Sequence, residues 1–222
     1  MTDTRNRHWV VAGGGTGGHV TLALALAERI AARGDGVLLL GSEHGLETRL
    51  VPEAGFELVS LPARQVMGQS LAARARAVPG MLRACAAARK TLRASRTDIV
   101  ISVGGYASVP AVAAAALARV PLALVEPNAI PGRANRLAAR FARRVFVQFR
   151  AAADIFARGA ARHRVREAGI PLRLSLVAAF RENPPRRRPE PPIPIQILYH
   201  FLRIWPIVPT VVAVPAPYGL LR

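Results

Sequence analysis

The sequence predicts an α/β domain in which parallel strands form a central sheet and helices cover both of its faces. Strand-like and helix-like segments alternate up to about residue 170, which is the signature of this class. Two strand-like runs also end in glycine turns that lead directly into a helix. Strands are expected at residues 9–12, 37–41, 56–61, 98–103, 121–125, 145–147 and 165–169. Helices are expected directly behind the first glycine turn and at residues 45–54, 71–95, 110–118 and 131–141, and a helix with a turn is expected at residues 151–164.

The helical predictions rest on the spacing of apolar residues and on helix breakers. In the first helix Leu22, Leu26 and Ile30 fall four residues apart, which is the pattern of a helix with one buried face. In the stretch of residues 71–95, the Pro-Gly pair at residues 79–80 is expected to kink or divide the helix, because proline lacks the N–H that a helix interior needs.

The first glycine turn, Gly13-Gly14-Gly15-Thr16-Gly17-Gly18, is followed at once by His19. Glycines let the backbone approach an anion, and the N-terminus of the next helix supplies free N–H groups and a partial positive charge. This stretch therefore predicts a phosphate-binding turn, with His19 at its mouth as a proton acceptor for a bound substrate. A structural role for His19, in which it only packs the start of the helix, stays open.

The same turn also fits a dinucleotide-binding fingerprint, Gly13-x-Gly15-x-x-Gly18. Such a site needs an acidic residue about 20 positions beyond the glycines, at the end of the second strand, to hold a ribose. Here the second strand ends in Ser42-Glu43, so the acid comes a little late. The dinucleotide-binding domain of an oxidoreductase is therefore the alternative interpretation.

A second glycine turn, Gly104-Gly105-Tyr106, follows the strand expected at residues 98–103, and Glu126 and Asn128 follow the next strand. Ligands of open parallel sheets bind at the carboxyl ends of the strands. Both glycine turns and these two polar residues are therefore expected at one edge of the sheet, with His19 and Asn128 facing one cleft. This convergence is a more specific signal than any one of its parts.

The chain is strongly basic, with 31 Lys and Arg against 13 Asp and Glu and a formal net charge of +18. Such a surplus indicates an anionic partner, which is nucleic acid, a phosphorylated substrate or an acidic lipid surface. Because Lys90 is the only lysine, part of the charge also fits the codon bias of a GC-rich genome. No nucleic-acid partner is expected, since no known motif occurs and aromatic residues are scarce near the Arg clusters.

The single cysteine, Cys85, excludes an internal disulfide and a cysteine-based metal cluster and fits a reducing cytosol. No metal-ligand cluster is visible, and no cofactor is expected. The first seven residues run straight into a strand and leave no room for the core of a signal peptide. Before residue 193, every apolar run is too short or too interrupted by Arg to span a membrane.

The helical stretch of residues 71–96 carries much of the positive charge, and no acid occurs between Glu57 and Asp98. Its basic residues are Arg74, Arg76, Arg83, Arg89, Lys90, Arg93 and Arg96. Apolar residues such as Val78 and Leu82 lie among them, which predicts a helix that can lie on an anionic membrane surface. A solvated basic face without a partner is the alternative.

The tail differs from the rest of the chain. Residues 183–194 contain six prolines around three arginines, which is typical of a linker without a packed core. Residues 195–198 look like a new strand, but neither a glycine turn nor a helix start follows them. We expect a domain at residues 1–173, a Pro/Arg-rich linker at residues 174–194, and an aberrant or truncated start of a second domain at residues 195–222.

Four motifs occur in an order that resembles the N-terminal half of the MurG family of N-acetylglucosaminyltransferases, over roughly residues 8–173. They are Gly13-Gly14-Gly15-Thr16-Gly17-Gly18-His19, Asp98-(x5)-Gly104-Gly105-Tyr106, Glu126-Pro127-Asn128 and Gly169-Ile170-Pro171-Leu172-Arg173. The resemblance implies a GT-B fold, in which an N-terminal Rossmann-like domain receives a lipid-linked acceptor and a C-terminal domain holds the UDP-sugar.

The resemblance also implies an inverting transferase of peptidoglycan synthesis. It would move GlcNAc from UDP-GlcNAc to the MurNAc 4-hydroxyl of undecaprenyl-diphosphate-MurNAc-pentapeptide (lipid I to lipid II), as a peripheral protein on the cytoplasmic side of the cell membrane. His19 is implied as the general base, without a metal. The residues implied for UDP-GlcNAc are Thr16, Gly17, Gly18, Asn128 and Arg173. Those implied for the acceptor diphosphate are Gly14, Gly15, Gly104, Gly105 and Tyr106.

The sequence departs from the family pattern in three places. The family usually has Pro at the position of Leu22 and commonly Gln at that of Pro127, and neither change is expected to abolish the phosphate turn. After Leu198 there is no counterpart of the donor domain, and a frameshift in a GC-rich gene would give such an ending. We therefore expect a truncated chain that folds to about residue 173 and has no transferase activity by itself.

Overall fold

The structure of the chain is a computed structural model that describes residues 6–63, 71–159 and 161–182, and the side chains of residues 71–76 are not described. Strands and helices alternate along these residues. In chain order they are β1 (His8–Gly13), α1 (Gly17–Ala31), β2 (Gly36–Ser42), α2 (Glu47–Glu53), β3 (Leu58–Leu61), α3 (Leu71–Ala94), β4 (Ile99–Gly104), the 3₁₀ helix η1 (Tyr106–Ser108), α4 (Val109–Ala118), β5 (Leu122–Glu126), α5 (Arg133–Ala138), β6 (Arg144–Val147), α6 (Arg150–Ala157), the 3₁₀ helix η2 (Arg162–Arg164), β7 (Val165–Glu167) and α7 (Leu174–Glu182).

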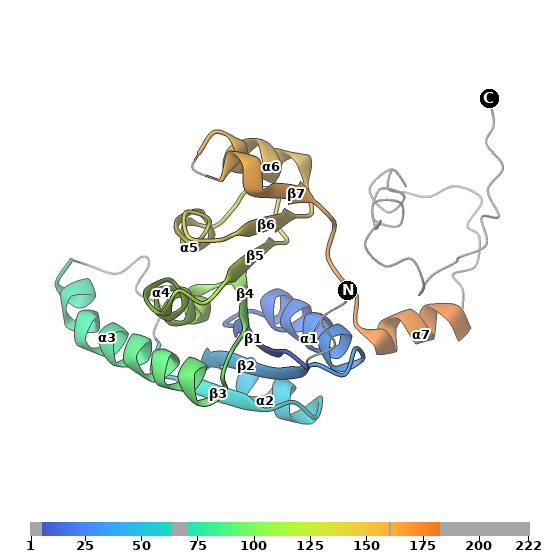
Figure 1. Ribbon diagram of the computed structural model, residues 1–222, viewed down its shortest axis with the longest axis horizontal. Helices are drawn as coiled ribbons and strands as arrows, with labels where there is room; N and C mark the ends of the chain where they lie inside the picture. The colour runs from blue at the N-terminus through green and yellow to red at the C-terminus, as the bar shows by residue number, and fades with distance from the viewer. Residues whose placement is uncertain (1–5, 64–70, 160, 183–222) are drawn as a thin grey trace. The chain divides into compact units, whose positions relative to one another are not determined.

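The strands form one sheet of seven in the order β3-β2-β1-β4-β5-β6-β7, and every neighbouring pair is parallel (Figure 1). The order reverses between β1 and β4, where the chain moves from one half of the sheet to the other. In parallel sheets the crevice at such a switch point lies outside the carboxyl ends of the strands. The predicted α/β fold with a parallel sheet is confirmed.

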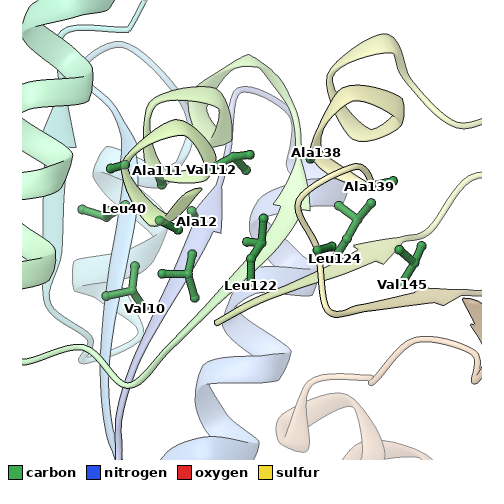
Figure 2. Close-up of a cluster of buried hydrophobic side chains, with 14 of the residues drawn as sticks. Val10, Ala12, Leu40, Ala111, Val112, Leu122, Leu124, Ala138, Ala139 and Val145 are labelled. Carbon is green, nitrogen blue, oxygen red and sulfur yellow. The ribbon is translucent and has the colours of Figure 1, made fainter. Parts of the chain in front are cut away.

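Side chains of successive strand residues pack in different hydrophobic cores, one on each face of the sheet, because they point alternately to opposite faces. Val10 and Ala12 of β1 pack under the layer of α3, α4, α5 and α6, where Figure 2 shows them with Leu122 and Leu124 of β5. Val11, between them, packs with α1 and α2 on the other face. Burial on both faces explains why the strands read as continuous apolar runs in the sequence.

Two predicted helices differ from the structure. Pro79 lies inside α3, and of the two expected outcomes, a kink or a division, the division is wrong because the helix continues from Leu71 to Ala94. Ala84, Ala88 and Leu92 of this helix are buried against the sheet, and this packing outweighs the cost of about 3 kcal/mol for an interior proline. The helix expected at residues 131–141 is shorter, since α5 ends at Ala138 and continues as a turn.

Residues 174–182, expected as part of the linker, form the helix α7. Its start is fixed by Glu28 of α1, whose carboxylate accepts hydrogen bonds from the Leu174 N–H (2.6 Å) and from Nε of Arg173 (2.7 Å). Sequence patterns did not show this helix because its first contact is with a residue 146 positions away. The rest of the linker and the tail from residue 195 lie outside the described residues.

Candidate functional site

The two glycine turns lie against each other at the carboxyl edge of the sheet. A Cβ atom at Gly105 would collide with the backbone oxygen of Gly14 and would lie 3.6 Å from Nδ1 of His19. A Cβ atom at Gly15 would collide with the ring of Tyr106. The absence of side chains at these glycines is therefore what lets the turn after β1 approach the turn after β4.

His19 lies in the first turn of α1 and is half-buried. Its Nδ1 is 2.7 Å from Oγ1 of Thr16, the residue that caps this helix. Burial lowers the pKa of His19 below its ordinary value of 6.5, because it disfavours the imidazolium, and the negative charge of Glu126 partly opposes this effect. If Nδ1–H donates to Thr16, Nε2 keeps its lone pair, which is the state required of a proton acceptor.

Glu126 ends β5 and is fully buried. Its Oε1 accepts hydrogen bonds from both the backbone N–H (2.9 Å) and Nδ2 (2.8 Å) of Asn128, while Oε2 accepts one from Nδ2 of Asn135 (2.7 Å). Glu126 thus holds the Asn128 side chain, and its charge acts on His19. The expected common edge for His19 and Asn128 agrees with this arrangement.

The sequence reasoning missed Glu47, the first residue of α2, which is 1% exposed. Its carboxylate accepts hydrogen bonds from the Gly15 N–H (2.9 Å), the Ser42 N–H (2.8 Å) and the Ser42 hydroxyl (2.7 Å). Burial by itself would raise the pKa of Glu47, but these hydrogen bonds outweigh it and the pKa is lowered. A glutamate that follows Gly41 and Gly45 just beyond a strand was the signal available in the sequence.

The backbone N–H groups of the first glycine turn and those at the start of α1 differ in whether they are free to bind a ligand. The Gly15 N–H donates to Glu47 and is therefore not free for the acceptor diphosphate to which the resemblance assigned it. Thr16 uses its hydroxyl on His19 and makes no side-chain bond to the helix backbone. Within the described residues, no recorded hydrogen bond uses the N–H groups of Gly17, Gly18 or His19. Helix N–H groups of this kind can hold an anion.

Arg173 does not join the other expected contacts of the sugar nucleotide. It pairs with Glu28, which lies about 16 Å beyond the start of α1 at 1.5 Å per residue. Thr16, Gly17 and Gly18 lie at that start, next to His19. Glu43, the acid considered for a ribose, is exposed just beyond β2.

The exposed surface of α3 and α4 is basic and partly apolar. Val78 and Leu82 of α3 and Leu117 of α4 are exposed, and a hollow of about 410 Å³ lies between the C-terminal parts of these helices. Arg89, Arg93 and Arg119 line this hollow. Across the described residues, no helix is long and apolar enough to cross a membrane, and no group of three acidic, His or Cys side chains is placed to hold a metal ion.

Comparison with known proteins assigns most of this fold to one family. The model of the glycosyltransferase family 28 N-terminal domain matches residues 9–147. The chain is 46% identical over 169 residues to the UDP-N-acetylglucosamine–N-acetylmuramyl-(pentapeptide) pyrophosphoryl-undecaprenol N-acetylglucosamine transferase of Rubrobacter xylanophilus, covering 76% of this chain and 49% of the relative. It is 40% identical over 178 residues to the transferase of the same name from Halothermothrix orenii, covering 78% and 47%. The chain thus spans about half the length of these curated relatives.

Solved structures agree with this comparison. The crystal structure of Acinetobacter baumannii MurG superposes with a TM-score of 0.56 at 27% identity and covers 66% of this chain and 42% of that chain. A putative UDP-N-acetylglucosamine 2-epimerase from Listeria monocytogenes gives a TM-score of 0.57 over 85% of this chain and 50% of that chain. At 14% identity the second likeness shows the fold alone.

Proposed function

The chain belongs to glycosyltransferase family 28, and from this membership we propose that it forms the acceptor-binding half of an inverting N-acetylglucosaminyltransferase of peptidoglycan synthesis. The reaction transfers GlcNAc from UDP-GlcNAc to the 4-hydroxyl of MurNAc in undecaprenyl-diphosphate-MurNAc-pentapeptide, which converts lipid I to lipid II. The observation that supports this most strongly is the 46% identity over 169 residues to a transferase of that name.

In this proposal His19 is the general base. Nδ1–H of His19 donates a hydrogen bond to Thr16, and Nε2 takes the proton of the MurNAc 4-hydroxyl. As this proton leaves, the hydroxyl oxygen forms a bond to the anomeric carbon of the donor. The bond from that carbon to the diphosphate oxygen breaks, UDP leaves, and attack from the opposite side inverts the configuration. The lowered pKa keeps His19 neutral before the reaction, and the charge of Glu126 stabilises the imidazolium that forms.

The remaining site residues bind and orient substrates. Thr16, Gly17, Gly18 and Asn128 contact UDP-GlcNAc where the donor reaches this half. The acceptor diphosphate lies at the glycine turns, where the start of α1 adds N–H groups and a partial positive charge. Arg173 contacts the donor only after it leaves its ion pair with Glu28, which already uses its Nε.

We also propose that the protein works as a peripheral protein on the cytoplasmic face of the cell membrane, with α3 against acidic lipids. The support is the exposed pair Val78 and Leu82 among arginines on a helix without acidic residues. Each arginine at the surface contributes about 1 kcal/mol, and salt weakens the attraction. Co-sedimentation with vesicles should rise with the fraction of anionic lipid and fall with salt. Binding that changes neither with the fraction of anionic lipid nor with the salt concentration would contradict this part of the proposal.

The central test is ligand binding by the whole 222-residue chain. A lipid I analogue with a shortened, water-soluble lipid should bind saturably, and inorganic pyrophosphate should compete with it. NADH, the ligand of the alternative dinucleotide-binding interpretation, should not bind, so the fluorescence of NADH should stay unchanged when the chain is added. A chain that binds NADH and not the lipid I analogue would overturn the proposed function.

A further inference from the structure

Glu47 places a buried negative charge behind both glycine turns. Its two carboxylate oxygens accept three hydrogen bonds, one from Gly15 and two from Ser42. In the part of the chain that the structure describes, no lysine or arginine forms an ion pair with it. Hydrogen bonds alone therefore keep the carboxylate charged, in agreement with its lowered pKa.

Three glycines make room for this carboxylate. A Cβ atom at Gly14, Gly41 or Gly45 would collide with the side chain of Glu47. These glycines come from three different segments: the first turn, β2 and the loop before α2. Gly14 therefore serves the packing of a protein carboxylate, although its place in the sequence suggests the approach of a ligand phosphate.

The charge of Glu47 fixes the direction of a longer chain of hydrogen bonds. An ionised carboxylate only accepts, so the single hydroxyl proton of Ser42 is donated to Glu47. Oγ of Ser42 is also 3.1 Å from the hydroxyl of Tyr106. Because Ser42 has no second proton, Tyr106 must be the donor in this bond.

The phenol of Tyr106 consequently has no proton left for a ligand. Its oxygen keeps acceptor capacity, and the residue is partly exposed at the second glycine turn. Phosphate oxygens are acceptors at neutral pH, and they cannot make a hydrogen bond with a second acceptor. A sugar hydroxyl or an amide N–H is the partner that this arrangement selects.

We propose that Glu47 is a positioning residue that orients Tyr106 through Ser42, so that Tyr106 accepts a hydrogen bond from a hydroxyl or amide N–H of the acceptor sugar. The diphosphate then lies at the start of α1, on N–H groups that the donor does not occupy, because the Gly15 N–H is already bound to Glu47. This inference rests on the proposed function and deepens it. It gives the two glycine turns different tasks, one for the anion and one for the sugar.

The test compares two probes on the whole chain, inorganic pyrophosphate and the water-soluble lipid I analogue. Tyr106→Phe keeps the ring against Gly15 and removes only the hydroxyl. It should lower the affinity for the lipid I analogue about 3- to 10-fold, the usual range for one neutral hydrogen bond, and leave the affinity for pyrophosphate unchanged. Glu47→Gln should also weaken the analogue. Glu43→Gln, which removes an exposed charge from the adjoining loop, is the matched control and should change neither.

Equal weakening of both probes by Tyr106→Phe would show that Tyr106 donates to the diphosphate, and no weakening of either would show that it contacts neither group. Both outcomes overturn the inference. Failure of the wild-type chain to bind the analogue would instead count against the proposed function.

An NMR measurement decides the positioning role independently of any ligand. Hydroxyl exchange of Tyr106, followed through its Cζ resonance in mixed light and heavy water, should be slowed in the wild-type chain. Ser42→Ala and Glu47→Gln should both accelerate it, and Glu43→Gln should not. The Gly15 amide resonance should shift in Glu47→Gln, which reports the lost carboxylate contact. Rapid exchange in the wild-type chain, or equal rates in all variants, would refute the link from Glu47 to Tyr106.

Discussion

Two buried glutamates stand behind the same edge of the sheet, and their partners are of different kinds. Glu47 accepts hydrogen bonds from the backbone N–H groups of Gly15 and Ser42 and from the Ser42 hydroxyl, whereas Glu126 accepts them from the side-chain amides of Asn128 and Asn135 and from one backbone N–H. Glu126 also raises the pKa of His19 through its charge, and no such effect of Glu47 is found.

The difference shows that a buried carboxylate at this site can either fix the backbone conformation or act on the group proposed as the general base. A backbone N–H can only donate, so Glu47 fixes the path of the glycine turns. By accepting the Ser42 hydroxyl proton it also fixes the direction of the bond from Tyr106 to Ser42. A side-chain amide can rotate to exchange donor and acceptor. Glu126 therefore holds movable groups and contributes its charge to the proposed general base.

The largest effect should come from the base itself. In an active transferase that contains this half, His19→Ala should lower turnover about 10²–10⁴-fold, the usual scale for a lost acid–base group. His44→Ala, which removes an exposed histidine from the loop before α2, is the control and should retain turnover. Near wild-type turnover in His19→Ala would leave His19 as a residue that only packs the helix start, and Glu126 would lose its proposed link to the chemistry.

The comparison of the two carboxylates is tested next by replacing each with its amide. In Glu47→Gln, either orientation of the amide places its NH₂ against a backbone N–H, so the free energy of unfolding should fall by about 1–3 kcal/mol. In Glu126→Gln, Asn135 can flip, because its Oδ1 has no hydrogen-bond partner among the described residues and can accept the new N–H. The loss should therefore stay below about 1 kcal/mol. Urea denaturation measures both, and equal losses would remove the distinction.

The same denaturation experiment has a pH dependence with a defined sign. The folded pKa of Glu47 lies below its ordinary value of 4.5, so the unfolded chain takes up the proton first as the pH falls. The stability contributed by Glu47 is thus present above the unfolded pKa and is lost as the pH falls through the folded pKa. Glu47→Gln should lose this part of the acid dependence, and an unaltered pH profile would contradict the assignment.

Two glycine substitutions sharpen the packing side of the comparison. Gly45→Ala should cost about 1–3 kcal/mol of unfolding free energy, because its Cβ atom collides with Glu47. Gly18→Ala meets no atom within 4 Å and lies in α1, where alanine is the better helix former. It should be neutral or stabilising by about 0.5–1 kcal/mol. Thermal denaturation separates the two, and equal effects would show that the carboxylate is not confined by its glycines.

The smallest expected effect is a change in the titration of His19. Burial lowers its pKa and Glu126 opposes this, so Glu126→Gln should move the titration of the His19 ring to lower pH. Glu47→Gln should leave it in place. NMR titration of the chain resolves the direction, with His44 as an exposed reference. A shift of equal size in both variants would mean that the two charges act on His19 alike.

The sequence predicted the sheet, the two glycine turns and their common edge because each depends on local patterns. Apolar runs mark the strands, and the topology of a parallel sheet brings the residues that follow them to one side. His19, Asn128 and Glu126 were found in this way. Glu47 was not, because its partner Gly15 is 32 positions away and nothing near residue 47 shows that its carboxylate turns inward. The resemblance implied Arg173 as a contact of UDP-GlcNAc, and the sequence did not show that it pairs with Glu28, 145 positions away.

By itself, the sequence determined the fold class, the family and the residues that follow the strands, since these are fixed by short-range periodicity and by motifs read along the chain. Only the tertiary structure decided how the hydrogen bonds of the site are oriented. That orientation depends on which buried acceptor meets which donor across distant segments, as in the 64-residue separation between Ser42 and Tyr106. The physical reason is that each hydroxyl carries one proton, and its direction is set by the charge at the far end of the chain of hydrogen bonds.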